Sequence, residues 1–459
     1  MYQIDFHSPV RIHFIGIGGI SMSGLAEILL KEGFSVSGSD SRESELTRHL
    51  EARGAVICYG QCAENIKEGT EVVVYTAAIH ADNPEFAAAA AAGIPMLTRA
   101  ELLGQIMRNY RTAIAVSGTH GKTTTTSMLS TVLLQGNMDP TISVGGILPA
   151  IGGNIRVGHS ETFLTEACEY TNSFLSFHPT ISIILNIEED HMDFFKDLAD
   201  IRSSFRRFAG LLPENGLLII NGEIEHPQEI TAGISARTVN YGLTGTEDYT
   251  AQDISYNETG CASFTAIGCG RMLGQVTLNV PGIHNVSNAL AAIAAALELN
   301  IPFEQIQKGL TAFHGTDRRF QYKGEVNGVT VIDDYAHHPT EIEATLKAAA
   351  NYPHRELWCV FQPHTYTRTK AFLHEFAQAL SHADHVVLTD IYAARETDTL
   401  GISSRTLQEE IQKLGKTCHY FPSFDEVEKF LSEKCIHGDL LITMGAGDVL
   451  KIGENLLSR

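Results

Sequence analysis

Short apolar runs alternate along most of the chain with longer segments of helix-like composition. Runs such as 12–15, 113–116 and 181–185 are typical of strands that are buried on both faces. Segments such as 22–30 and 288–299 have the length and composition of helices. This alternation predicts an α/β protein whose sheets are largely parallel. The chain shows no internal repeat and no low-complexity tract.

The alternation falls into three blocks, which we interpret as three domains. A stretch at 107–111 reads as a linker and ends a predicted N-terminal domain of residues 1–108. A central domain of residues 109–316 follows, with an antiparallel-looking insertion at 249–280. The predicted C-terminal domain, residues 317–459, alternates strands with amphipathic helices and is expected to be Rossmann-like. Its predicted strands are 329–332, 357–361, 385–388 and 439–444.

The composition is ordinary for a globular protein. Of the 459 residues, 44% are hydrophobic and 19% are charged. The N-terminus lacks a signal-peptide pattern, and no apolar segment reaches the roughly 18 residues of a membrane span. The eight cysteines show no C-x-x-C spacing, so we expect reduced thiols and a cytoplasmic location. A net charge of −21 argues against binding to nucleic acid or anionic membranes.

The most informative motif is Gly-Thr-His-Gly-Lys-Thr-Thr at 118–124, directly after the run 113–116. A strand, a glycine-rich turn and a helix cradle phosphates, because the N–H groups of the turn and the positive helix end face the anion. Lys122 is placed to reach the β- and γ-phosphates of ATP and Thr123 to hold Mg²⁺, which predicts a P-loop ATPase domain. Val116 stands where the full motif has glycine, so a plain strand-to-helix turn is the alternative. The other loop residues expected at the cofactor are Gly118, Thr119, His120, Gly121 and Thr124.

A second glycine loop lies near the N-terminus. Gly16, Gly18, Gly19 and Ser21 lie between a strand and a helix, and Asp40 ends the next strand about twenty residues on. This is the layout of a dinucleotide-binding fold, so the N-terminal domain is predicted to be Rossmann-like. Alone it fits a nicotinamide-dependent oxidoreductase equally well. Combined with the loop downstream, it favours a nucleotide diphosphate here and a triphosphate in the central domain.

Acidic groups follow two further strands of the central domain. Glu166 ends one apolar run, and another is followed by Glu-Glu-Asp-His-Met-Asp at 188–193. Because the carboxyl ends of parallel strands meet at one edge of a sheet, we expect both near Lys122. Glu166 suits Mg²⁺ as an oxygen ligand. His191 is a less usual ligand for this ion and, taken alone, reads as a turn histidine. The run 188–193 could equally be a solvated acidic turn.

Amide and basic groups suggest contacts with the nucleotide. Asn285 and Asn288 are three residues apart and share one face near the start of a helix. Together they suit recognition of a base or phosphate, although either could simply cap the helix. Arg319 lies at the second domain boundary, from which a guanidinium could reach the γ-phosphate. A surface arginine is the alternative.

The first two strands of the C-terminal domain also end in polar groups. Asp334, His337 and His338 follow the strand at 329–332, together with a helix-starting Pro-Thr, which is an unusual composition for a solvated loop. His364 and Arg368 follow the next strand in a basic and polar segment. Arg368 could bind a carboxylate there.

These motifs occur in the order found in the Mur ligases of peptidoglycan synthesis, which the sequence resembles over nearly its whole length. The resemblance implies three α/β domains: the first holds a UDP-sugar, the second ATP, and the third contributes to ATP and amino-acid binding. Within the family, segments 364–368 and 391–396 look like the branch that joins L-alanine to UDP-N-acetylmuramate. The motifs that carry the resemblance are 118–123, Glu166, 186–191, His284 with Asn285 and Asn288, 318–320 and 334–339.

The resemblance implies ATP-driven ligation through an acyl phosphate, with Mg²⁺ bound by Thr123, Glu166 and His191. A base near the amine is expected, with His337, His338 and His364 as candidates. The implied catalytic residues are Lys122, Glu166, His191, Arg319 and Asp334. Around ATP, the loop 118–124 is joined by Asn285, Asn288, Arg319 and Asp334. The residues implied for the UDP-sugar and the amino acid are Gly16, Gly18, Gly19, Ser21, Asp40, His337, His338, His364 and Arg368.

Some positions depart from the family pattern. Ser21 replaces a frequent glycine, Cys168 a frequent acid and Thr365 a frequent arginine. Several relatives use a carbamylated lysine in the second domain, but Lys196 is the sole lysine at 192–215, so we do not predict that modification.

Three other functions remain open from the sequence. One is a recycling ligase that joins an intact tripeptide to the same UDP-sugar. The others are a nicotinamide-dependent oxidoreductase and a non-catalytic nucleotide switch. We expect a monomer or a homodimer.

Overall fold

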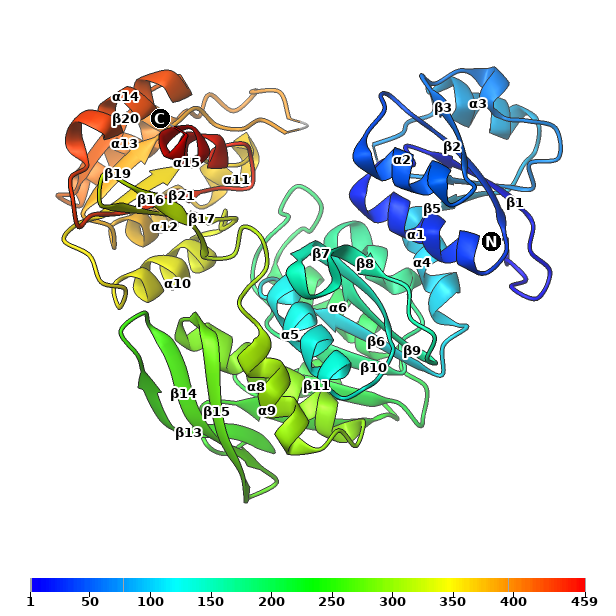
Figure 1. The fold of residues 1–459 in the computed structure, drawn as a ribbon, viewed down its shortest axis with the longest axis horizontal. Coiled ribbons are helices and arrows are strands. Elements are labelled where there is room, and N and C mark those ends of the chain that lie inside the picture. Colours follow the sequence, from blue (N-terminus) through cyan, green and yellow to red (C-terminus); the bar gives the residue numbers. More distant parts are fainter. Residues whose placement is uncertain (1, 77, 395, 459) are drawn as a thin grey trace.

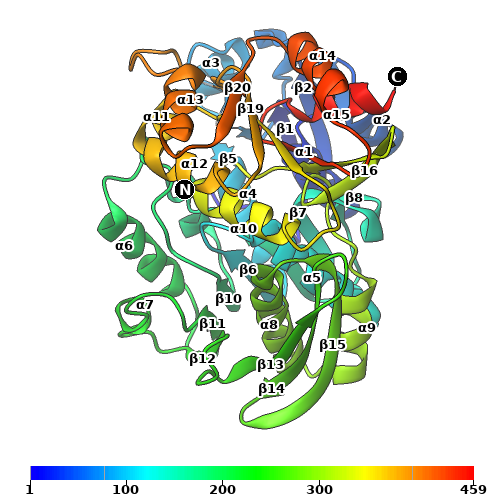
Figure 2. The same cartoon turned by 90° about the vertical axis from the view of Figure 1, so that its left-hand side faces the viewer.

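A computed structural model describes residues 2–76, 78–394 and 396–458 of the chain. Three lobes, each built on its own sheet, follow one another along the sequence (Figure 1). The N-terminal lobe and the C-terminal lobe both lie above the middle lobe, and the turned view shows the C-terminal lobe in front of the N-terminal one (Figure 2). The predicted three-domain α/β fold is confirmed. The boundaries expected at 108/109 and 316/317 stay predictions.

The N-terminal lobe has a five-stranded parallel sheet in the order β3-β2-β1-β4-β5. The order reverses between β1 and β4, where an open α/β sheet forms its ligand crevice. The glycine loop 16–21 joins β1 to α1 at this point. The elements are β1 (Arg11–Ile15), α1 (Ile20–Lys31), β2 (Ser35–Asp40), α2 (Glu45–Ala52), β3 (Val56–Tyr59), η1 (Ala63–Asn65), β4 (Val72–Tyr75), α3 (Pro84–Ala91), β5 (Met96–Thr98) and α4 (Arg99–Met107).

The middle lobe has a ten-stranded sheet in the order β15-β14-β13-β12-β11-β10-β6-β9-β7-β8. Its centre is parallel, whereas β13, β14 and β15 pair antiparallel, as the sequence predicts for 249–280. The strands are β6 (Thr112–Ser117), β7 (Thr141–Leu148), β8 (Gly153–Arg156), β9 (Thr162–Ala167), β10 (Ile181–Ile184), β11 (Leu217–Asn221), β12 (Arg237–Gly242), β13 (Tyr249–Tyr256), β14 (Cys261–Gly268) and β15 (Arg271–Pro281). The helices are α5 (Lys122–Gln135), η2 (Pro149–Ile151), η3 (Tyr170–Ser176), α6 (Leu198–Ala209), α7 (Gln228–Thr231), α8 (Ile283–Glu298) and α9 (Phe303–Ala312).

The C-terminal lobe has a six-stranded sheet in the order β16-β17-β21-β18-β19-β20, with only β16 antiparallel. No helix in the described part of the chain is long and apolar enough to cross a bilayer. The strands are β16 (Gln321–Val326), β17 (Val329–Asp334), β18 (Leu357–Phe361), β19 (His385–Leu388), β20 (Thr417–Tyr420) and β21 (Leu440–Met444). The helices are α10 (Pro339–Ala349), α11 (Tyr366–Ala371), α12 (Leu373–Leu380), α13 (Ser404–Lys413), α14 (Phe424–Lys434) and α15 (Leu450–Leu457).

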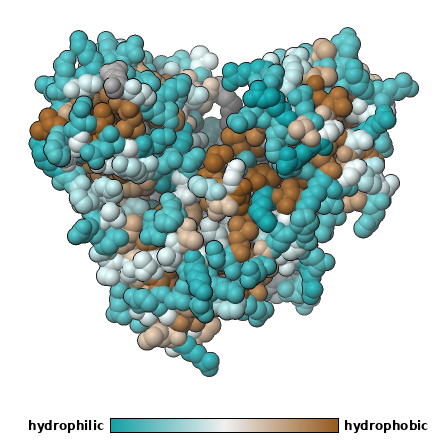
Figure 3. All heavy atoms as spheres, viewed as in Figure 1, coloured by the Kyte–Doolittle hydropathy of each residue, from teal (hydrophilic) through white to brown (hydrophobic). Residues whose placement is uncertain are grey.

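The apolar cores do not follow the division of the chain into three sheets. One cluster of buried side chains runs from the N-terminal lobe into one face of the middle sheet. The other face of the middle sheet has a core of its own, and the C-terminal lobe has two that contain only its own residues. The space-filling view shows a hollow between the two upper lobes, with apolar side chains gathered beneath it (Figure 3).

Candidate active site

The predicted phosphate loop joins β6 to α5, and its glycines are needed for its shape. Gly121 precedes the helix with φ 82°, in the left-handed region that favours glycine. At Gly118, φ is 144°, and a Cβ would lie 2.9 Å from Cβ of Leu185. The first N–H groups of α5, like those of any α-helix, lack acceptors within the helix.

Lys122 lies at the start of α5 and is held by acceptors of the surrounding loops. Its Nζ donates to the carbonyls of Gly118 at 2.5 Å and Thr119 at 3.1 Å, and lies 3.0 Å from Glu169 Oε2. Burial by itself would lower the pKa of Lys122, but the charges of Glu169, Cys168 and Glu166 outweigh burial and raise it. Lys122 is therefore a positive charge at neutral pH. Glu169 was not among the predicted site residues.

The three predicted metal ligands take part in two separate contacts near this lysine. Thr123 Oγ1 donates to Glu166 Oε2 at 3.1 Å, and burial raises the pKa of Glu166. His191 Nε2 lies 3.6 Å from Glu169 Oε1, so Glu169 joins His191 to Lys122. A hydroxyl and buried carboxylates are oxygen donors that fit Mg²⁺, and a cation would stabilise the ionised form of Glu166.

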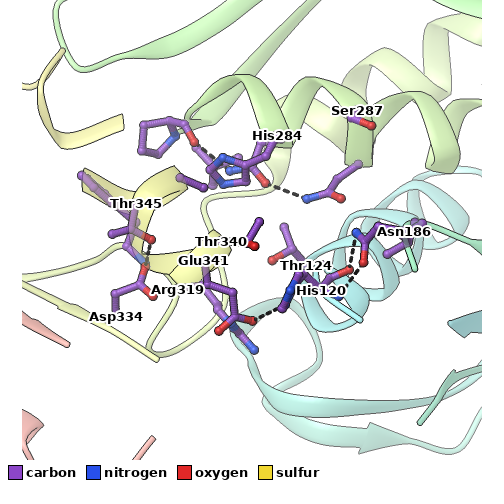
Figure 4. A pocket seen from close by; sticks show the side chains of 18 of the residues that line it. His120, Thr124, Asn186, His284, Ser287, Arg319, Asp334, Thr340, Glu341 and Thr345 are labelled. Atoms are coloured by element: carbon purple, nitrogen blue, oxygen red, sulfur yellow. Dashed lines mark hydrogen bonds and ion pairs between the residues drawn. The ribbon is translucent and has the colours of Figure 1, made fainter. Parts of the chain in front are cut away.

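A cavity of about 320 Å³ opens beside the phosphate loop and reaches the C-terminal lobe (Figure 4). Asn285 and Asn288 line it from α8. Since α8 begins after Gly282, neither asparagine is its N-cap; Asn285 Nδ2 instead donates to Pro281 O at 2.7 Å and Asn288 Nδ2 to Asn285 Oδ1 at 3.1 Å. The other predicted residues that line this cavity are His120, Gly121, Thr124, Arg319 and Asp334.

Arg319 and its neighbour Arg318 both lie over the ring of Tyr335 but face different polar groups. Arg318 Nε lies 3.0 Å from Asp333 Oδ2, so this arginine ties strands of the C-terminal lobe together. Arg319 faces the cavity with Asp334, whose carboxylate accepts the N–H groups of Phe320 at 2.8 Å and Ala336 at 2.7 Å. Burial raises the pKa of Asp334 to about 6 against the influence of Arg319 and these N–H groups.

The phosphate loop touches the C-terminal lobe through His120. Its Nδ1 lies 3.1 Å from Glu341 Oε1 in the first turn of α10 (Figure 4), and Thr340 Oγ1 donates to Glu188 Oε2 at 2.7 Å nearby. Burial would lower the pKa of His120, but Glu188 and Glu341 outweigh burial and raise it to about 9. Neither Glu188 nor Glu341 was predicted as a site residue.

A second cavity of about 850 Å³ lies between the middle and C-terminal lobes. His191, His337, His364 and Arg368 line it, whereas His338 lines a different cavity, with Nε2 3.0 Å from Glu189 O. Burial lowers the pKa of His337 to about 3, so its ring is neutral at pH 7.

Arg368 is not a free cation in this cavity. Its Nη2 lies 2.8 Å from Asp190 Oδ1, and its Nη1 lies 3.1 Å from His364 Nδ1. Arg368 and neighbouring histidines hold the pKa of Asp190 below its usual range despite burial. Thr365 caps α11 with φ 67°. Of the motif 391–396, Arg395 lies outside the described residues.

The glycine loop 16–21 forms hydrogen bonds with residues of its own lobe. Gly18 N donates to Asp40 Oδ2 at 2.8 Å, while Gly16 N donates to Ser39 O at 2.9 Å. Ser21 Oγ accepts from Arg99 Nη1 at 3.0 Å. Burial lowers the pKa of Arg99, and Cys168 and Glu166, across the lobe boundary, oppose this shift. Arg99 was not predicted as a site residue, since nothing nearby in the sequence marks it.

Models of three successive family domains match the chain in order. The Mur ligase family catalytic domain matches residues 11–111, the Mur ligase middle domain 116–296, and the Mur ligase glutamate ligase domain 318–447. The chain belongs to the Mur ligase family. The loops and cavities above are therefore those of a Mur ligase.

This Mur ligase has full-length relatives. It is 64% identical to the UDP-N-acetylmuramate–L-alanine ligase of Agathobacter rectalis over 459 residues, 100% of both chains. The crystal structure of the UDP-N-acetylmuramate-alanine ligase of Thermotoga maritima is 30% identical, with a TM-score of 0.81 over 98% of this chain and 99% of that one. A murein peptide ligase from Psychrobacter arcticus is 26% identical, with a TM-score of 0.70 over 98% of both chains.

Proposed function

We propose that this Mur ligase joins L-alanine to the lactyl carboxylate of UDP-N-acetylmuramate, with ATP converted to ADP and phosphate, in cytoplasmic peptidoglycan precursor synthesis. The observation that carries the proposal is the contact between the phosphate loop and the wall of the larger cavity. Glu169 contacts Lys122 of the phosphate loop, and His191, which lines the larger cavity, lies within 3.6 Å of the same carboxylate. Full-length similarity to an alanine ligase supports the choice of amino acid.

The chemistry begins with the lactyl carboxylate. Its oxygen attacks the γ-phosphorus of ATP, forms an acyl phosphate and releases ADP. A free carboxylate is a poor acyl donor because oxide is a poor leaving group, and phosphorylation supplies a better one. Lys122 and Arg319 are proposed to neutralise the charge that develops on the transferred group. Thr123, Glu166 and His191 would hold Mg²⁺, which would supply positive charge against the phosphate groups.

The second step requires a neutral amine. Alanine attacks the acyl carbon, an amide bond forms, and phosphate leaves. His337, His338 and His364 are the candidate proton acceptors, and His337 is a weak base among them because burial lowers its pKa to about 3. Arg368 and His364 are proposed to orient the alanine carboxylate. In this proposal the domain of residues 1–108 binds the UDP-sugar, that of residues 109–316 binds ATP, and that of residues 317–459 contributes to binding of the amino acid.

The test is phosphate release from ATP and Mg²⁺ with UDP-N-acetylmuramate, with L-alanine or the tripeptide L-Ala-γ-D-Glu-diaminopimelate added in separate wells. Release that needs both the sugar nucleotide and alanine is expected. Release only with tripeptide would place the chain in the recycling branch, and release with neither would contradict the ligase proposal. A parallel NADH titration, expected to show no binding, tests the oxidoreductase alternative.

A further inference from the structure

Three side chains with metal-ligating atoms meet where the phosphate loop faces α10. His120 comes from the loop, Glu188 from the segment after β10, and His338 from the residue that precedes α10. One ligand atom of each lies within 4.8 Å of the other two. The group therefore spans two lobes, and it shares no residue with Thr123, Glu166 and His191.

The ring of His120 is oriented as in metal-bound histidines. Its Nδ1 lies 3.1 Å from the carboxylate of Glu341, so the N–H on this side has an acceptor. Its Nε2 is buried, makes no hydrogen bond among the described residues, and lies 3.5 Å from Glu188 Oε2. Because the pKa of His120 is raised to about 9, a cation would displace a proton from this nitrogen. A histidine that donates one N–H to a carboxylate and directs the other nitrogen at a ligand site is the usual outer shell of a metal centre.

His338 and Glu188 are held in the same way. His338 Nε2 lies 3.0 Å from Glu189 O, which places the proton on Nε2 and the lone pair on Nδ1. That Nδ1 accepts a long hydrogen bond of 3.4 Å from Thr340 N as the N-cap of α10, and a bound cation would replace this bond. Thr340 Oγ1 donates to Glu188 Oε2 at 2.7 Å and so fixes the third ligand. Each ligand thus has an outer partner before any cation binds.

The distances suit a small cation after a modest contraction. Metal–ligand bonds of about 2.0–2.2 Å place tetrahedral ligand atoms about 3.3 Å apart. The His120–Glu188 pair is already at 3.5 Å, and no pair exceeds 4.8 Å. Two imidazoles and one carboxylate favour Zn²⁺ and its first-row neighbours over Mg²⁺, which prefers oxygen ligands.

A cation can reach the group from solvent. Glu188 and His338 line an open cavity of about 650 Å³, and the side chain of Glu188 is 38% exposed. Acidic side chains concentrate positive ions at such an opening. Those that line this cavity are Glu188, Glu189, Glu223, Glu225 and Glu375, with Arg202 as the basic side chain.

We propose that His120, Glu188 and His338 form a binding site for a Zn²⁺-type transition-metal cation, separate from the predicted Mg²⁺ site. The cation joins the phosphate loop to the start of α10 and so holds the middle and C-terminal lobes together. A bound cation should therefore oppose separation of the two lobes. Slower turnover in Zn²⁺ follows only if the ligase proposal is also correct, whereas binding does not depend on it.

The test is a Zn²⁺ titration of the full-length protein in excess Mg²⁺, read by competition with a chromogenic chelator. Wild type is expected to bind one equivalent. Glu188→Gln keeps an acceptor for Thr340, and His338→Asn keeps a good N-cap for α10, so both should fold. Each is expected to weaken Zn²⁺ binding by at least about tenfold.

Two further variants make the result decisive. His337→Asn alters the neighbouring histidine, which lines the other cavity, and should bind Zn²⁺ as wild type does. His191→Gln should also bind normally. Co²⁺ in place of Zn²⁺ should give the visible bands of a site with nitrogen ligands, and these should be lost in His338→Asn. Unchanged affinity in both ligand variants, or loss of the site in His191→Gln, would overturn the proposal, whatever the outcome of the ligase assay.

Discussion

The middle lobe meets its two neighbours in opposite ways. Against the N-terminal lobe the contact is close and largely apolar, with a few polar contacts such as Lys31 Nζ to Gly158 O and Asn154 Nδ2 to Ile20 O. A Cβ on Gly24 of α1 would lie 1.9 Å from Cδ1 of Ile155, and one on Gly104 of α4 would lie 1.9 Å from the carbonyl oxygen of Ser176. A single core of buried side chains crosses this boundary.

Against the C-terminal lobe the described contacts of the site are polar. His120 meets Glu341, Arg368 meets Asp190, and Thr340 meets Glu188. Apolar contacts are costly to open, because separation exposes packed surface to water. Polar contacts can be exchanged for water, substrate or ions. We therefore expect the C-terminal lobe to be the one that moves during the reaction, with the N-terminal and middle lobes staying together.

The largest expected effect tests whether the chemistry lies on the polar side. Lys122→Ala should lower kcat by a factor on the order of 10³ with folding intact, since the charge that faces the transferred phosphoryl group is removed. Phosphate release measures kcat, and thermal unfolding checks the fold. The matched control is Lys196→Ala, an exposed lysine whose loss should leave kcat unchanged. A near-normal rate for Lys122→Ala would remove the loop from catalysis.

The next effect tests the apolar boundary. In an open helix Gly→Ala is stabilising by about 1 kcal/mol. Gly104→Ala should instead destabilise the protein by about 1–3 kcal/mol, because its Cβ would overlap backbone atoms of Ser176. Gly153→Ala, whose Cβ meets nothing within 4 Å, is the control. Thermal unfolding compares the two, and a higher Tm for Gly104→Ala would show that the boundary is looser than described.

The difference between local and long-range contacts explains which features the sequence could predict. Both glycine loops were predictable, because a strand, a turn and a helix are consecutive in the chain. The roles of Glu169, Glu188 and Glu341 were not, since each acts through a partner that is distant in sequence: Glu341 lies 221 residues from His120, and Glu169 lies 47 from Lys122. Spacing along the chain carries no signal for such pairs.

The interpretation of Arg368 shows the same limit. The sequence presents it as a free cation for the alanine carboxylate, and the structure pairs it with Asp190, which is 178 residues away. The strands β16 and β20 were also missed, because they are short or partly exposed and lack an apolar run. Local pattern predicts elements buried on both faces, whereas edge strands and contacts between lobes depend on tertiary packing.

A smaller effect distinguishes two roles of Arg368: binding of alanine, and contact between the lobes at the polar boundary. Arg368→Ala should raise KM for alanine about 10- to 100-fold, the range expected for one charge-assisted hydrogen bond. KM for ATP should change far less. Initial rates with either substrate varied give both constants. Equal increases would mean that Arg368 acts through its pairing with Asp190, by holding the lobes together, rather than by contact with alanine.

The smallest effect concerns a buried carboxyl of the C-terminal lobe. The pKa of Asp334 is raised to about 6, against about 3.9 in an unfolded chain. Between these values the folded protein binds more protons than the unfolded chain, so the contribution of Asp334 to stability is greatest below pH 4, falls as pH rises to about 6, and is constant above. Asp334→Asn should remove this slope, which amounts to a Tm difference of about 1–3 °C in a chain with so large an unfolding entropy. Melting curves of both proteins across pH 4–8 isolate the contribution of Asp334, because every other carboxyl is common to the two. A parallel difference at all pH values would mean that Asp334 is ionised throughout this range and that Arg319 and the N–H groups of Phe320 and Ala336, rather than burial, set its charge.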